Sequence, residues 1–458
     1  MTNRTTTVEI AKGQGGVQFR LLESDVDYPN ALEFERFPLP PGVLPPLRTK
    51  TNVMSYGESL REALCGHSAV RAELEQLFGT LAQDQANLQF VMATTAAESY
   101  RWEALFNHPD CFLALKGPCS LKRIAWSTAG TTTGLRIFSK PIRMLAFLSP
   151  SNVNAASEFA AITAAVAGAR KWGLEIEATI YLGEQDLLNQ AETDSAAGAL
   201  PGIRVAPIPE SAVAIERAIL EGPVQILHFF CHGYAKDNVQ LLEFASISDH
   251  DHDGESEASG SIYLSADRLT QILSSLDTVW LTVLSSCSSA QETPGLFSMA
   301  GGLTKSGSPV TIGMAEPINS DDASVFAEVF YRHAFEIIGN AINGLAAGGT
   351  SMIDLGPAVN QARTRLYDAT QNAREETFGR WCLPILYERY TPLRVGLAPA
   401  REKPDEEMRK RIALVARSLR SLPWNTPLEL RNQVLALLDR PPVVPLALRP
   451  DPFGNFPA

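Results

Sequence analysis

The sequence predicts an α/β fold with a mainly parallel central sheet. Between residues 143 and 230 strand patterns alternate with helix patterns, the order typical of parallel strands joined by right-handed crossovers. Two further apolar runs, 224–233 and 278–290, are rich in β-branched and aromatic residues and are short for buried helices. We therefore expect them to be central strands that are covered on both faces.

The first 140 residues are expected to form a separate N-terminal lobe. Residues 1–15 are polar and are predicted to be frayed. The proline-rich stretch 39–47 excludes helix and inner strand and is predicted to be a connector. The remaining elements are predicted from apolar spacing: strands at 17–22, 32–37 and 87–93, and helices at 58–81 and 99–106.

Residues 141–398 are predicted to form the main domain, and two smaller parts follow it. Residues 405–440 form a module of two amphipathic helices, and residues 441–458 a proline-rich extended tail. Within the main domain we expect strands at 143–148, 174–182, 224–233, 278–290, 309–314, 383–387 and 392–397, and helices at 155–172, 211–220, 265–276, 321–338 and from 357.

Composition excludes several classes of protein. The net charge of −12 argues against a nucleic-acid surface, which needs clustered Lys and Arg. No apolar run approaches the roughly 18 residues that span a bilayer, and the N-terminus lacks the apolar core of a signal peptide, so we expect a cytoplasmic protein without membrane contact. The six cysteines form no CxxC pair, which indicates neither a disulfide framework nor a zinc site. No P-loop, GxSxG or HExxH motif occurs.

His232 and Cys287 end the two apolar runs. Because the carboxyl ends of parallel strands meet at one edge of a sheet, where ligands of such folds bind, we expect the two side chains to lie together. A thiolate nucleophile with a histidine to shuttle the proton is the chemistry of a cysteine protease. Gly233, which has no side chain to obstruct a substrate, and Cys287 are the expected backbone donors to the oxyanion.

The same residues also have ordinary explanations. A cysteine in an apolar strand is most often a buried hydrophobic residue, and a histidine at a strand end is most often a turn residue. Their joint placement at equivalent strand ends, 55 residues apart, favours the catalytic interpretation. His228 and Cys231 are weaker candidates: alternation places His228 and His232 on one face and Cys231 on the other, and only His232 is followed by glycine at the exit of the strand.

The blocks around these residues, 226–233 and 283–289, resemble the two signature blocks of CHAT-domain peptidases, which are caspase-like cysteine proteases related to separase. Tyr100-Arg101-Trp102-Glu103-Ala104-Leu105 resembles a block of the family's N-terminal pseudo-caspase part. The resemblance implies a three-layer α/β/α sandwich and a regulated endopeptidase that cleaves a specific protein. It also implies an activating protein partner and a role in bacterial defence or cell death. A catalytically silent scaffold that binds partners is the alternative.

Acidic residues near these strand ends suggest two further roles. Asp253, Glu316 and Asp321 are candidates for the wall of the substrate pocket, where they would favour a basic side chain, although an apolar one stays open. Asp249, Asp251 and Asp253 match the first half of a calcium loop, but its twelfth position is Gly260 instead of the expected glutamate. We therefore interpret residues 249–260 as a solvated acidic loop and expect no cofactor and no metal, with calcium as the alternative to test.

Overall fold

A computed structural model gives the architecture of the chain. It describes residues 3–40, 42–79, 84–109, 111–117, 119–125, 134–236, 239–250, 260–286, 298–371, 375–398, 406–423, 426–439 and 450. Residues 1–397 form one compact unit and residues 398–458 a second. Among the described residues, no helix combines the length and apolarity needed to cross a bilayer.

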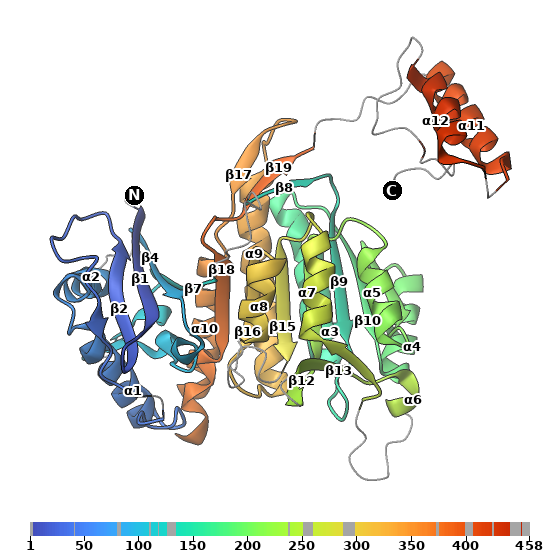
Figure 1. Ribbon diagram of the computed structural model, residues 1–458. Coiled ribbons are helices and arrows are strands. Elements are labelled where there is room, and N and C mark those ends of the chain that lie inside the picture. Colours follow the sequence, from blue (N-terminus) through green and yellow to red (C-terminus); the bar gives the residue numbers. More distant parts are fainter. Residues whose placement is uncertain are drawn as a thin grey trace. The chain divides into compact units, whose positions relative to one another are not determined.

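A mainly parallel sheet runs through the first unit, in the order β11-β10-β9-β12-β15-β16-β18-β7-β4-β1-β2-β3 (Figure 1). In addition, β13 pairs with β12, and β14 pairs with β13. Its described strands are β1 (Asn3–Gly13), β2 (Gly16–Glu23), β3 (Glu35–Arg36), β4 (Gln85–Met92), β7 (Cys119–Ala125), β9 (Ile142–Leu148), β10 (Ile176–Leu182), β11 (Ile203–Pro207), β12 (Ile226–Lys236), β13 (Val239–Phe244), β14 (Ile262–Ser265), β15 (Leu281–Ser286), β16 (Val310–Met314) and β18 (Pro384–Arg389).

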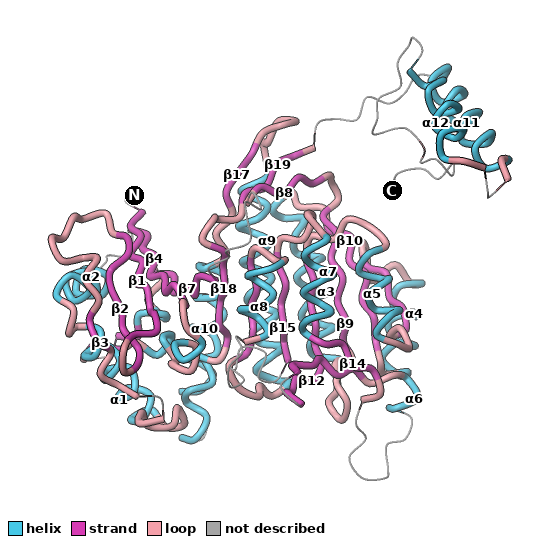
Figure 2. Tube along the Cα trace, viewed as in Figure 1, coloured by secondary structure: helices cyan, strands magenta, loops and turns pink. Residues whose placement is uncertain are grey.

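Helices cover both faces of this sheet, as Figure 2 shows. Leu227, Phe229 and Cys231 of β12 pack in one core with α5, α7 and α8, while Ile226 and Phe230 pack in the other with α3, α9 and α10. The predicted α/β fold with a mainly parallel sheet between helical layers is therefore confirmed. The helices of this unit are α1 (Lys50–Leu64), α2 (Ser68–Gly79), α3 (Ala156–Ala169), α4 (Gln185–Ala196), α5 (Ala212–Leu220), α6 (Ile247–His250), α7 (Ala266–Ser275), α8 (Met299–Ser306), α9 (Ser320–Ile342) and α10 (Gly356–Gln371).

The predicted elements of the main domain agree with the structure more closely than those before residue 140. Residues 1–15, predicted to be frayed, contain β1, which lies between β2 and β4. The predicted helix 58–81 is two helices, α1 and α2, and the predicted helix 99–106 is a 3₁₀ turn at Trp102–Ala104. The predicted division at residue 140 stays a prediction. The sheet continues across it, from β18 to β7.

The described part of the second unit contains α11 (Glu406–Ser421), α12 (Leu428–Leu435) and a 3₁₀ turn, Ala436–Asp439. Ile412, Val415, Leu419 and Leu438 form its small core. Arg431 is 3% exposed, and its guanidinium donates a 2.7 Å hydrogen bond to the Pro423 carbonyl, so it closes the turn between the helices. The tail, 441–458, lies outside the described residues except for Pro450.

Candidate active site

Three parallel strands end at the same edge of the sheet. Cys231 of β12 lies opposite Ser286 of β15, and Phe230 lies opposite Leu148 of β9. His232 directly follows Cys231 on β12. Cys287 directly follows Ser286 in the sequence but lies outside the described residues. The structure thus places the described ends of both predicted catalytic strands side by side, as their apolar patterns predict.

The loop after β9 orients His232. The ring nitrogen Nε2 lies 2.6 Å from the carbonyl oxygen of Ser151, and that serine is buried. Because a carbonyl oxygen only accepts hydrogen bonds, Nε2 must carry the proton. The loop itself is fixed to β12, since the Ser149 N–H donates to the Phe230 carbonyl at 2.9 Å. The ring therefore has a defined tautomer and a defined direction.

β12 continues past the point where the sequence predicts its exit. From His232 to Lys236 it forms a hairpin with β13, in which His232 faces Glu243 and Gly233 faces Leu242. Gly233 is therefore part of an antiparallel ladder rather than the first residue of an open turn. A residue of such a ladder directs its N–H either toward the partner strand or away from it. Its role as an oxyanion donor stays a prediction.

His228 occupies the core instead of the sheet edge. Its side chain is fully buried, with Nδ1 2.9 Å from the Tyr331 hydroxyl on α9 and Nε2 3.0 Å from Oε1 of Glu158 on α3. Burial, together with the charge of Glu158, raises the pKa of Tyr331 well above its ordinary value. The three residues tie α3 and α9 to β12. Cys231, also buried, faces the opposite core, as strand alternation predicts.

The structure describes two of the three predicted pocket residues. Glu316 follows β16, and its Oε1 lies 3.4 Å from Nη2 of Arg101, which also donates to the Ala315 carbonyl at 3.1 Å. Asp321 is exposed in the first turn of α9. Asp253 lies outside the described residues. Because Glu316 already has a basic partner within the chain, its interaction with a substrate stays a prediction.

Asp249, the first residue of the calcium alternative, has hydrogen-bond partners within the protein. Its Oδ2 accepts from the Ser246 N–H at 2.6 Å and from the Ser261 N–H and hydroxyl at 3.0 and 2.7 Å. Burial tends to raise the pKa of this carboxyl, but these hydrogen bonds outweigh it and lower the pKa. Asp251 and Asp253 lie outside the described residues. Within the described ranges, no three His, Cys, Asp or Glu side chains gather as metal ligands do.

A cavity of about 510 Å³ lies at the other end of the strands, far from His232. It is lined by the first residues of β9, β10 and β11 and by the C-terminal end of α5, including Arg143, Glu177 and Glu221. In open α/β sheets ligands bind at the carboxyl ends of strands. This cavity is therefore not part of the candidate active site.

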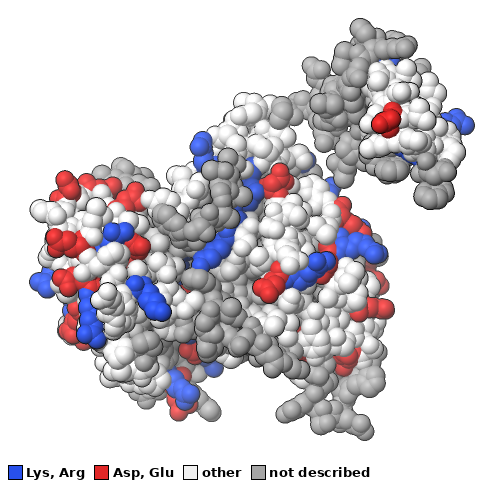
Figure 3. Space-filling view, in the orientation of Figure 1, with Lys and Arg blue, Asp and Glu red and all other residues white. Residues whose placement is uncertain are grey.

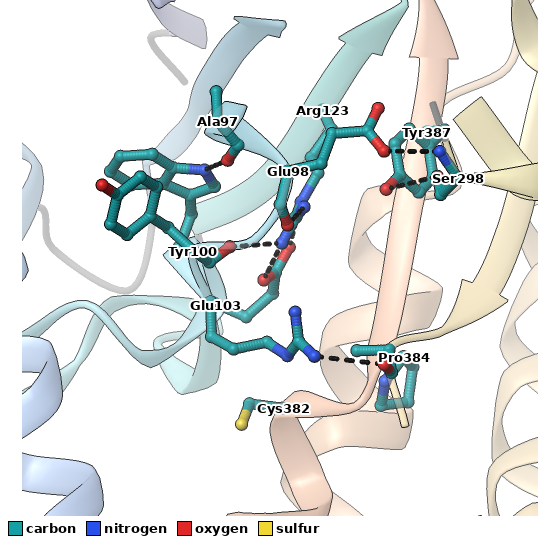
Figure 4. Close-up of polar contacts among 12 residues, drawn as sticks. Ala97, Glu98, Tyr100, Glu103, Arg123, Ser298, Cys382, Pro384 and Tyr387 are labelled. Carbon is teal, nitrogen blue, oxygen red and sulfur yellow. Dashed lines mark hydrogen bonds and ion pairs between the residues drawn. The ribbon is translucent and has the colours of Figure 1, made fainter. Parts of the chain in front are cut away.

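A buried polar network at β7 and β18 was not predicted from the sequence (Figure 4). The Arg123 guanidinium of β7 binds both carboxylate oxygens of Glu103, at 3.1 and 2.8 Å, and the backbone carbonyls of Glu98 and Tyr100 at 2.9 Å. Burial alone would raise the pKa of Glu103, but the charge of Arg123 lowers it. The Arg123–Glu103 pair is fully buried. It holds the turn 98–103 against the sheet.

The carboxylate of Glu98 extends this network to α8, the first described element after β15. Oε2 accepts a 2.8 Å hydrogen bond from the backbone N–H of Ser298, just before α8. The Ser298 hydroxyl donates to the Tyr387 hydroxyl on β18 at 3.0 Å. Burial raises the pKa of Glu98, and the Ser298 bond and the charge of Arg123 partly offset this. A buried carboxylate among aromatic residues has no periodic sequence pattern that reveals it.

Comparison with known proteins gives one family match. Residues 206–336 match the model of the CHAT domain. The matched segment contains both His232 and Cys287, so it confirms the resemblance to CHAT-domain peptidases over these residues. Curated proteins give no match.

Solved structures of the Saccharomyces cerevisiae separase–securin complex are similar to the chain. The 2.6 Å structure has a TM-score of 0.34 and 12% identity, over 74% of this chain and 18% of that chain. The 3.0 Å structure has a TM-score of 0.32 and 10% identity, over 72% and 17%. The chain thus spans less than a fifth of the separase chains it matches.

Replacing Arg123 tests the buried network. Arg123→Ala leaves the Glu103 carboxylate buried without its partner, and we expect a loss of about 3–5 kcal/mol in the free energy of unfolding. Urea unfolding followed by circular dichroism measures it. Arg332→Ala, which breaks the exposed Arg332–Glu328 pair, is the control and should cost about 0.3–0.5 kcal/mol. Equal losses in the two variants would show that the network does not stabilise the fold.

We expect the thermal stability of the fold to depend on pH through Lys305 of α8. Burial lowers the pKa of its ammonium to about 8, with a smaller opposing effect from Glu98. The charged form is therefore disfavoured in the folded chain below pH 8, and this cost disappears as the pH rises from 8 toward the ordinary value of 10.5. Lys305→Met should raise the midpoint of thermal unfolding at pH 7 and progressively less at pH 9 and 10. A constant difference between pH 7 and 10 would contradict this, and exposed Lys171→Met is the control.

Proposed function

We propose that this chain, whose residues 206–336 match the CHAT domain, is a cysteine endopeptidase with a His232–Cys287 dyad. The observation that carries the proposal is the parallel register of β12 with β15, in which Cys231 lies opposite Ser286. Each of these two residues is directly followed in the sequence by a member of the dyad. Neighbouring strands that end together are the arrangement that a nucleophile and its base require.

The hydrogen bond of His232 supports its role as the base. Since Nε2 donates to the Ser151 carbonyl, proton exchange with the thiol and the leaving amine would use Nδ1. The Ser151 carbonyl would also stabilise the imidazolium that forms when Nδ1 takes the thiol proton. A buried backbone carbonyl would thus perform the orienting function that a third side chain performs in other catalytic sites.

The proposed reaction has two steps. The Cys287 thiolate attacks the peptide carbonyl, backbone N–H groups of Gly233 and Cys287 stabilise the oxyanion, and imidazolium His232 protonates the leaving amine. Water, deprotonated by the same imidazole, then attacks the thioester and releases the carboxylic acid and the free thiol. Asp253, Glu316 and Asp321 are the proposed pocket residues. We further propose that a protein partner triggers cleavage of a specific protein in a bacterial defence or cell-death pathway.

The reactivity of Cys287 tests the dyad without a known substrate. We expect iodoacetamide to alkylate Cys287 of the full chain well below pH 8.5, the usual pKa of a free thiol, because His232 stabilises the thiolate. In His232→Ala the rate at pH 6.5 should fall on the order of tenfold or more, toward that of a free thiol. Mass spectrometry of peptides measures the rate at each cysteine.

Cys65 and Cys111 are internal controls for this experiment. Both are half-buried, and burial raises the pKa of each thiol, so they should react slowly and equally in wild type and His232→Ala. A Cys287 rate that does not change in His232→Ala would sink the dyad assignment.

Cleavage itself is measured with a library of proteome-derived peptides, comparing wild type with Cys287→Ala. New N-termini that appear only with wild type support the endopeptidase and reveal the preferred side chain. Cleavage that persists in Cys287→Ala contradicts it. A wild-type chain that cleaves nothing and has an unreactive Cys287 favours the scaffold alternative.

A further inference from the structure

α8 is the first described element after Cys287, and its start is held by three separate contacts. Ser298, eleven residues after Cys287, caps the helix by accepting the Gly301 N–H at 3.1 Å. Its hydroxyl also donates to Tyr387, and its own N–H donates to Glu98. One residue thus joins α8 to β18 and to a turn that lies 200 positions earlier in the chain.

Glu98 is suited to hold this end of the helix. Its side chain is 1% exposed, and it lies against the first turn of α8, where the helix dipole favours negative charge. A Cβ atom at Gly301 would come within 2.9 Å of Oε1, so the carboxylate packs directly on the helix backbone. Arg123 donates a 2.9 Å hydrogen bond to the Glu98 carbonyl and so fixes the backbone from which the carboxylate extends (Figure 4).

Two arginines hold the opposite end of α8. Arg389 donates to the Thr304 carbonyl at 2.9 Å, and Arg136 donates to the Gly307 carbonyl at 3.1 Å. Both side chains are 6% exposed. Cations at a helix C-terminus complement its negative end. A helix of eight residues is thus fixed at both ends by buried groups of opposite charge, two of which, Glu98 and Arg136, come from the predicted N-terminal lobe.

We propose that Glu98 is a positioning residue for the proposed cysteine nucleophile. The inference rests on the proposed function. Cys287 lies in the sequence between Ser286, the last residue of β15, and Ser298, the cap of α8. Pairing within the sheet fixes the first of these two residues, and the hydrogen bond to Glu98 fixes the second. The N-terminal part of the chain, far from the dyad in sequence, thereby contributes directly to the reactivity of Cys287.

Variants of Ser298 isolate the hydrogen bond. Ser298 has φ −55° and ψ 153°, a backbone conformation that proline adopts, so Ser298→Pro removes the donated N–H without requiring a new φ. Ser298→Ala keeps that N–H and, like Ser298→Pro, loses the hydroxyl. We expect Ser298→Pro to lower the alkylation rate of Cys287 at pH 6.5 about tenfold relative to Ser298→Ala. Rates at Cys65 and Cys111 should not change.

Variants of Glu98 complete a double-mutant cycle. Glu98→Ala should lower the Cys287 rate by about the same factor and should have no further effect in the Ser298→Pro background. Glu98→Gln, whose amide oxygen still accepts the Ser298 N–H, should keep most of the wild-type alkylation rate of Cys287. Together with Ser298→Pro, it also tests the hydrogen bond if Glu98→Ala does not fold. On any peptide that wild type cleaves, Glu98→Ala should lower kcat and leave KM within about twofold. Glu62→Ala, an exposed position on α1, is the control.

The outcomes separate this inference from the proposed function. If His232→Ala slows alkylation of Cys287 but Glu98→Ala and Ser298→Pro do not, the dyad stands and the positioning role is wrong. If the Glu98 and Ser298 effects add independently, they do not act through their hydrogen bond and the inference fails. If His232→Ala has no effect, the proposed function itself fails. Circular dichroism of each variant distinguishes a local effect on Cys287 from loss of the fold.

Discussion

The position of β18 between two halves of the sheet is the constraint on which the rest of the structure depends. It pairs antiparallel with β16 on one side and parallel with β7 on the other. Every residue of β18 is buried, yet Tyr387, Glu388 and Arg389 are polar. Each therefore needs a partner from another element: Tyr387 bonds Ser298, Glu388 lies 3.1 Å from the Lys122 ammonium, and Arg389 bonds the Thr304 carbonyl.

These buried contacts specify the register of β18 more than they stabilise it. A buried ion pair often contributes little net stability relative to an apolar pair of similar size. A slip of one residue, however, would exchange the two faces of the strand. Tyr387 and Arg389 face the core that contains α8, and Glu388 faces the opposite core. A slipped strand would turn the Glu388 carboxylate toward apolar side chains and separate it from Lys122. The buried polar residues of β18 thus disfavour the wrong register. Other charged side chains, both acidic and basic, lie on the molecular surface, as the face in Figure 3 shows.

The strands at the candidate site could be predicted because burial on both faces gives continuous apolar runs. β12 and β15 have this pattern where they pair with each other, and β9 has it at its end, from Ala146 to Leu148. The residues at the strand ends follow directly from it. β1 could not be predicted in the same way, since Thr6 and Thr7 are polar in the sequence but fully buried between β2 and β4. The hydroxyl of Thr6 reaches the Glu73 carboxylate of α2 at 2.6 Å, a partner that no local pattern indicates. Likewise His67, in the break between α1 and α2, has a distant partner: its Nε2 bonds the Glu33 carbonyl at 3.0 Å.

The candidate site therefore has one part that depends on local sequence and one that depends on distant pairing. The ends of β12 and β15 belong to the first, because strand pattern and strand order suffice to bring Cys231, which His232 directly follows, opposite Ser286. The environment of Ser298 belongs to the second. Glu98 is a carboxylate in a short turn, the setting of a solvated residue, and only the pairing of β7 with β18 buries it against α8. Burial costs such a charge several kcal/mol unless hydrogen bonds compensate, so the same pairing that buries Glu98 also requires the Ser298 N–H to be present. The hydrogen bond between Glu98 and Ser298 is thus a consequence of the pairing of β7 with β18. Any support that it gives to Cys287 comes from the fold as a whole rather than from the segment that carries the cysteine.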